Sequence, residues 1–167
     1  MVRSVSLIAG VVILAFSTTV GRGASETDSP WVRGIFTGKS PRPLQVKETE
    51  AWQRASELAG RTPGAFVVVG GGESMLPLYS PGTILVMRHC GYDKLESGQT
   101  ALYRNHDGKT VAHVLVTKAR DGWRVAGLNN RNHDMEPVLA RNLVGVVIAA
   151  FRPLADGRAL HLASIGP

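Results

Sequence analysis

The pattern of apolar and polar positions changes twice along the chain. After an apolar N-terminal stretch, residues 25–46 are polar and contain Pro30, Pro41 and Pro43, a composition typical of a linker. Between residues 48 and 59 apolar side chains recur at helical spacing, which predicts a short amphipathic helix that stops at Gly60. From Ala65 onward the apolar runs become short and are separated by turn residues, so the rest of the chain is expected to form strands.

The short apolar runs predict an antiparallel, mainly β fold. The expected strands cover residues 65–69, 83–88, 99–104, 110–118, 123–126, 142–151 and, as a last edge strand, 158–163. Asp-Gly turns at Asp107-Gly108 and Asp121-Gly122 indicate two hairpins. Strands at this spacing are typical of a sandwich or of a small, coiled, partly open barrel.

The first 24 residues are expected to be a hydrophobic helix that serves as an export signal or membrane anchor. Arg3 provides a positive start, and residues 4–21 carry no charge. The apolar core at residues 7–16 lies between the roughly 7–15 residues of a signal peptide and the about 20 needed to span a bilayer. Gly21 and Gly23 suit a cleavage after Gly23, so a cleaved signal and a retained anchor both remain open. Either one places the rest of the chain on the extracytoplasmic side of a membrane.

Length and composition indicate one globular domain with appendages. The 167 residues divide into residues 1–24, a linker and helix at 25–64, and a domain at 65–167. The net charge is +6, but the basic residues are scattered, which favours an ordinary solvated surface over a nucleic-acid partner. A single cysteine, Cys90, excludes an intrachain disulfide. We predict no metal and no cofactor.

The strongest chemical signal is a serine that follows three glycines. Gly70-Gly71-Gly72 ends an expected strand and precedes Glu73 and Ser74. Glycines allow unusual backbone angles and close approach of another chain, so Ser74 could present its hydroxyl at a turn. Backbone N–H groups there could face a developing oxyanion. The alternative is a flexible surface loop with an incidental serine.

A serine nucleophile needs a base, and His113 is the main candidate. It lies in an apolar strand, on the same face as Val111 and Leu115. Burial favours the neutral imidazole that a general base requires. Alternatives are a core histidine without a catalytic role, and Lys109 as the base.

A triad also needs a group that orients the imidazole. The loop of residues 127–134 is rich in asparagine, and Asp134 is its only carboxylate. Asp134 is therefore the candidate third member, with a turn-capping role as the alternative.

These segments, in this order, resemble the signal peptidase I family of the superfamily that includes self-cleaving repressors. The resemblance covers about residues 66–151 and is similar to the branch with a Ser–His–Asp site. The matching segments are Ser-Met-Leu-Pro at 74–77, Ser-Pro-Gly-Thr at 80–83, Ser-Gly-Gln-Thr at 97–100, His113, Asn129-Asn130 and Asp134. The resemblance implies the coiled β fold of these peptidases, a catalytic Ser74, His113 and Asp134, and cleavage beside small residues.

The chain departs from the family pattern at four positions. Val114 stands where Arg usually follows the histidine, Gln99 and Leu128 replace usual aspartates, and Gly72 replaces a serine that donates to the oxyanion in the housekeeping branch. The departures favour, as an alternative, an inactive peptidase-fold module that binds or regulates.

The sequence therefore predicts a membrane-associated serine endopeptidase that cleaves exported precursor proteins. Its partners are expected to be a peptide or protein substrate and the membrane, without nucleic acid, and the oligomeric state stays open. The residues expected to form the oxyanion site and substrate cleft are Gly72, Glu73, Met75, Leu76 and Pro77.

Overall fold

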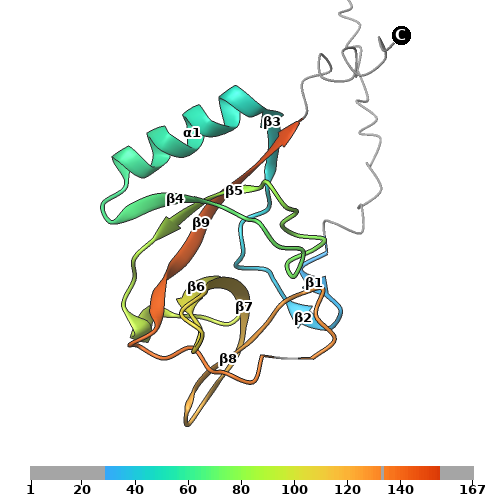
Figure 1. The fold of residues 1–167 in the computed structure, drawn as a ribbon, viewed down its shortest axis with the longest axis vertical. Helices are drawn as coiled ribbons and strands as arrows, with labels where there is room; N and C mark the ends of the chain where they lie inside the picture. Colours follow the sequence, from blue (N-terminus) through green and yellow to red (C-terminus); the bar gives the residue numbers. More distant parts are fainter. Residues whose placement is uncertain (1–28, 133, 155–167) are drawn as a thin grey trace, which may run out of the picture.

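The computed structural model describes residues 29–132 and 134–154, and most of its regular structure is β-strand (Figure 1). The strands of the main sheet are β3 (Leu44–Lys47), β4 (Ala65–Val69), β5 (Ile84–Arg88), β6 (Thr100–Arg104), β7 (Thr110–Ala119), β8 (Gly122–Ala126) and β9 (Leu143–Leu154). Their order is β4-β5-β9-β6-β7-β8, with β3 paired to β9. Every pair in that order is antiparallel, and β3 with β9 is parallel. The mainly β, antiparallel prediction is confirmed. In the described part of the chain the sheet does not close into a barrel, because its two end strands, β4 and β8, do not pair with each other.

Both faces of β6 and of the central part of β7 are buried, because these strands lie between two apolar clusters. On β6, Leu102 enters one cluster while Ala101 and Tyr103 enter the other. On β7, Val114 and Leu115 divide in the same way, and both are fully buried. Register shifts in the β5–β9 and β6–β9 pairs add to the twist of the sheet, since a bulge increases local twist.

Helix α1 (Glu48–Arg61) covers β4, β5 and β9 at the end of the sheet away from β8 (Figure 1). Ala51 and Ala55 are fully buried against the third apolar cluster, which includes Ile84 and Phe151. The predicted start of the helix is confirmed, but the predicted stop at Gly60 is wrong, because the helix continues to Arg61. Thr62 is extended because it precedes Pro63, which disfavours helical angles at the residue before it.

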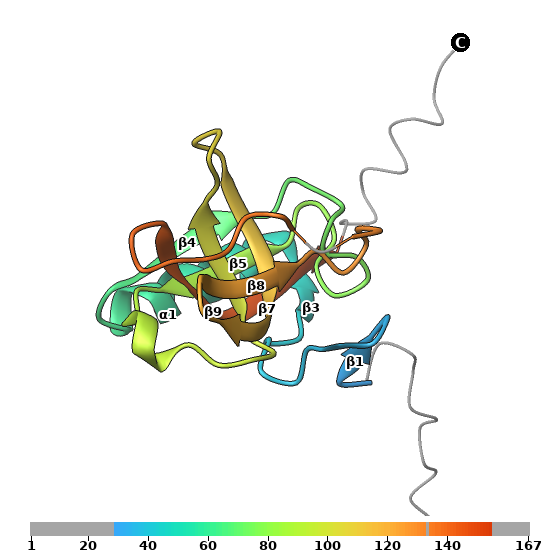
Figure 2. The same ribbon diagram turned by 90° about the horizontal axis from the view of Figure 1, so that it is seen from below.

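Residues 29–46 are built into the domain, which corrects the expectation of a linker. β1 (Trp31–Val32) and β2 (Ile35–Phe36) form a hairpin that turns at Arg33 and Gly34, both with positive φ. The sequence pattern does not reveal these two strands, because each has only two apolar residues among polar neighbours. Val32 and Ile35 nevertheless pack against the core. Figure 2 shows this hairpin, in blue, at the edge of the domain away from α1.

The expected strands between residues 65 and 151 are confirmed, with ends that shift by one to three residues. The expected strand at 158–163 and the hydrophobic segment at 1–24 lie outside the described residues. Within the residues that the structure describes, no helix is long and apolar enough to cross a membrane.

Gly60 provides a direct test of where the helix ends. A Cβ added at Gly60 would meet no atom within 4 Å, and the residue is helical and exposed. Gly60→Ala should therefore raise the free energy of unfolding by about 0.5–1 kcal/mol, measured by urea denaturation. The matched variant Gly64→Ala should lower it by about 1 kcal/mol, because Gly64 has φ of +72°. Destabilisation by Gly60→Ala would contradict the helix boundary described here.

Candidate active site

Ser74 lies on a turn in the segment that connects β4 to β5, and hydrogen bonds between the two ends of this segment hold it in place. These hydrogen bonds run from Gly70 N–H to Thr83 O (2.9 Å) and from Gly82 N–H to Gly70 O (2.7 Å). After the glycines the chain makes a helix-like turn, in which Tyr79 N–H donates to Met75 O at 2.9 Å. Met75 and Tyr79 are buried in the core, which holds the turn that carries Ser74.

His113 is positioned by the central part of β7. It pairs with Ala101 of β6 and is 6% exposed, next to the fully buried Val114 and Leu115. Its Nε2 atom lies 3.0 Å from Ser74 Oγ, within hydrogen-bond distance. The expectation that His113 shares a face with Val111 and Leu115 is confirmed. Val111 and Leu115 pack in the same apolar cluster, and His113 lines a pocket together with Val111.

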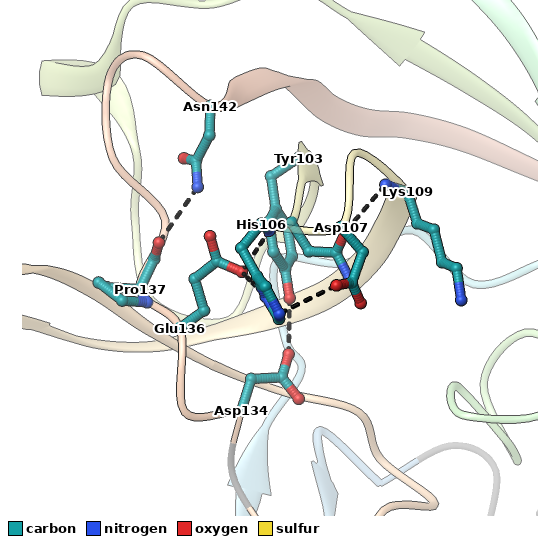
Figure 3. A network of polar contacts seen from close by, with 9 residues as sticks. Tyr103, His106, Asp107, Lys109, Asp134, Glu136, Pro137 and Asn142 are labelled. Atoms are coloured by element: carbon teal, nitrogen blue, oxygen red, sulfur yellow. Dashed lines mark hydrogen bonds and ion pairs between the residues drawn. The ribbon is translucent and has the colours of Figure 1, made fainter.

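Asp134 lies in the loop between β8 and β9, where its N–H donates to Val125 O at 3.0 Å. Its Oδ2 atom contacts His113 Nδ1. The same oxygen accepts a hydrogen bond of 2.6 Å from Tyr103 OH, and Figure 3 shows this bond. A carboxylate at Nδ1 favours the tautomer with a proton there, which leaves Nε2 to accept the Ser74 proton. The structure thus brings together Ser74, His113 and Asp134.

Two further contacts join the loops that carry these groups. Asn129 N–H donates to Ser74 O at 2.8 Å, so the asparagine-rich loop is bonded directly to the residue expected to be the nucleophile. Arg33 Nη1 donates to Asn130 O at 3.1 Å, which ties the β1–β2 hairpin to the same loop. The predicted polar loop therefore holds the position of Ser74 as well as carrying Asp134.

A cavity of about 460 Å³ opens beside Ser74. It is lined by Gly72, Ser74 and Met75, together with residues of β4 and of the start of β7. Of the residues predicted for the oxyanion site and cleft, Gly72 and Met75 line this cavity, whereas Glu73, Leu76 and Pro77 are not among its lining residues. These three lie in the same turn, where Leu76 N–H donates to Glu73 O at 3.1 Å.

Two strand edges border this cavity without a partner strand. β4 pairs only with β5, and Val68 and Val69 line the cavity. On β7, pairing with β8 begins at Val114, so residues 110–113 are paired on the β6 side alone, and Thr110, Val111 and Ala112 line the cavity. Backbone donors and acceptors are thus available on both of these strands.

Backbone N–H groups are also available next to Ser74. Within the described part of the chain, the N–H groups of Gly72 and Ser74 have no hydrogen-bond acceptor. A Cβ added at Gly71 or Gly72 would meet no atom within 4 Å, so the space beside these groups is open. Two such donors near a nucleophile can stabilise a developing oxyanion.

The positions that depart from the family pattern have structural roles here. Val114 and Leu128 are fully buried in one core cluster, and Gln99 Oε1 accepts from Glu96 N–H at 2.9 Å in the turn before β6. The alternative base Lys109 is exposed in the β6–β7 hairpin. Among the described residues, no group of three or more His, Cys, Asp or Glu side chains is arranged to hold a metal.

Tyr103 is the site residue that the sequence analysis did not identify. It is 2% exposed, and burial, followed by the hydrogen bond to Asp134, raises the pKa of its hydroxyl above the usual range. The sequence gives only an indirect indication of this contact. The Asn105–Lys109 turn implies a strand pairing in which Tyr103 lies diagonally across from His113.

Comparison with known proteins adds no relative. Neither the scan against models of protein families nor the search of curated proteins finds a match to this chain.

Gly127 provides a test of the His113 geometry that needs no substrate. A Cβ added there would lie 2.6 Å from Asn130 Nδ2 and 3.0 Å from His113 Nε2. Gly127→Ala should therefore displace the imidazole from Ser74 and shift the His113 Nε2 signal in long-range ¹H–¹⁵N spectra. Gly71→Ala, which meets no atom within 4 Å, should leave that signal in place. An unchanged signal in Gly127→Ala would contradict the close packing of Gly127 on the imidazole.

Proposed function

We propose that this chain is a serine endopeptidase resembling signal peptidase I, which cleaves exported precursor proteins with Ser74 as the nucleophile. The observation that carries the proposal is the continuous contact from Ser74 Oγ to His113 Nε2 (3.0 Å) and from His113 Nδ1 to Asp134. A buried imidazole held at one nitrogen by a carboxylate and facing a hydroxyl at the other is the arrangement that nucleophilic serine catalysis requires. The finer fold assignment, a partly open barrel of the signal peptidase–repressor type, belongs to the same proposal.

The reaction follows from the three contacts. Ser74 Oγ attacks the scissile carbonyl while its proton moves to His113 Nε2, and the negative charge of Asp134 stabilises the imidazolium that forms. The imidazolium then gives the proton to the leaving amine, and the C–N bond breaks to leave an acyl-enzyme. Water then attacks the ester carbonyl while His113 takes one of its protons. As the bond from the acyl carbon to Ser74 Oγ breaks, His113 gives that proton to Ser74 Oγ, which frees the acid product and restores the site.

Oxyanion stabilisation is assigned to the backbone at residues 72–74. The N–H groups of Gly72 and Ser74 lie beside the nucleophile without an acceptor in the described chain, and Gly72 leaves the space open. One well-placed donor contributes roughly 3–4 kcal/mol to transition-state stabilisation in comparable sites. A side-chain donor is therefore not required at position 72.

The substrate is proposed to bind as an extended chain between the two free strand edges. The β4 edge and residues 110–112 of β7 both line the cavity, so main-chain hydrogen bonds can hold the peptide in place. The apolar lining from Val68, Met75, Leu85 and Leu102 suits apolar side chains before the scissile bond. Small residues next to that bond are what the family resemblance implies, and the membrane location is proposed from the uncharged apolar stretch within residues 1–24.

Variants of the two reacting groups test the proposal. Ser74→Ala and His113→Ala should each abolish cleavage of an exported model precursor in detergent, measured by the appearance of the mature N-terminus, because each removes a reacting atom. Ser56→Ala, on the exposed face of α1, is the matched control and should cleave like the wild-type protein. Cleavage by purified Ser74→Ala would contradict the proposal, and absence of cleavage by the wild-type protein would favour the inactive binding module.

A further inference from the structure

We propose that Tyr103 is a positioning residue of the same site, which holds the Asp134 carboxylate in the orientation that His113 requires. The inference rests on the proposed function for its catalytic consequence, whereas the positioning itself is a property of the folded chain. It extends the Ser74, His113 and Asp134 contacts to a fourth side chain on a different strand.

Two donors converge on one oxygen of Asp134. Tyr103 OH lies 2.6 Å from Oδ2, and His113 Nδ1 contacts the same atom. A hydrogen bond to a carboxylate is shorter and stronger than one between neutral groups, and two donors at fixed angles define the plane of the carboxylate. Removing the tyrosine hydroxyl would take away one of the two donors that meet at Oδ2.

Tyr103 and Asp134 differ in how firmly their backbones are held. Tyr103 lies within β6, paired with Val111 on one side and with Leu143 on the other. Asp134 lies in an irregular segment that follows β8 and precedes Val138, which forms an isolated bridge with Trp123 of β8. The strand residue therefore serves as the fixed point and the loop residue as the group that is positioned.

The register of β6 and β7 places the tyrosine and the histidine on one face. Tyr103 pairs with Val111 and Ala101 pairs with His113, so Tyr103 and His113 are diagonal neighbours. Their ring centroids are 6.4 Å apart in an edge-on arrangement with an interplanar angle of 63°. This geometry allows both side chains to reach a carboxylate that approaches from the adjacent loop.

The Tyr103 hydroxyl has the properties of a permanent donor. Burial is the main reason that its pKa is raised, and the nearby Asp134 raises it further, so the phenol is protonated at neutral pH. At 2% exposure the side chain presents very little surface to a substrate, and its hydroxyl is bonded to Asp134. The hydroxyl therefore affects the reaction through Asp134. Tyr103 positions this carboxylate and does not itself react.

Tyr103→Phe removes the hydroxyl and retains the ring. We expect kcat of peptide cleavage to fall roughly tenfold to a hundredfold with KM little changed, the size of effect for a lost hydrogen bond to a charged group. Tyr92→Phe is the matched control, because Tyr92 OH also donates to this loop, at Val138 O (3.1 Å), without touching Asp134. Wild-type kcat in Tyr103→Phe, or an equal loss in both variants, would overturn the proposal.

A double-mutant cycle with Asp134→Ala separates positioning from a general structural effect. If Tyr103 acts through Asp134, Tyr103→Phe should cost less than about threefold in kcat once the carboxylate is absent, since residues of one network are not additive. The same tenfold or larger loss in both backgrounds would show that Tyr103 acts by another route and would overturn the proposal.

A readout without substrate distinguishes failure of this inference from failure of the proposed function. The His113 Nδ1 proton, in contact with Asp134, should give a low-field ¹H NMR signal that is lost in Asp134→Ala. Tyr103→Phe should shift or broaden this signal, and Tyr92→Phe should leave it unchanged. A signal that Tyr103→Phe does not alter would overturn the inference, even in a protein that cleaves; a shifted signal would support it, even in one that does not.

Discussion

The antiparallel pairing of β6 with β7 is the constraint on which the rest of the site depends. It matches Ala101 to His113 and Tyr103 to Val111, and the same alternation sends Leu102 and Val114 into the opposite core cluster. A shift of one residue in this register would place His113 and Tyr103 on opposite faces of the hairpin, so the two side chains could not both reach Asp134. The buried apolar residues on both faces oppose such a shift, so the packing of the core also specifies the geometry of the imidazole.

The loops gain their order from this fixed hairpin. Asp134 is held between His113 and Tyr103, Asn129 bonds to the carbonyl of Ser74, and Gly127 allows its loop to pass close to the imidazole. A polar network with its members satisfied is rigid in a low-dielectric setting, whereas a partly satisfied one is costly. The side chains of the proposed triad thus come from three separate segments, but the position of each depends on the others.

Much of the fold was predictable because apolar alternation and Gly-containing turns define strands locally. The triad candidates could also be named, since Ser74 follows a glycine run, His113 interrupts an apolar strand and Asp134 is the single carboxylate of its loop. Tyr103 was not predictable without a strand register, which depends on pairing at a distance. The sequence pattern could not show which residues of the turn after Glu73 line the cavity, and the helix runs one residue past Gly60 because helical angles become disfavoured only at Thr62, the residue before Pro63.

The central claim is that one serine, activated by His113, forms an acyl-enzyme. The most direct measurement is to treat the purified protein with a peptidyl phosphonate ester, which reacts with activated serines, and to locate the adduct by peptide mass mapping. The account predicts a single adduct on Ser74, formed at a rate that falls when His113 is replaced. An adduct on another residue, or formation at Ser74 that is independent of His113, would contradict it.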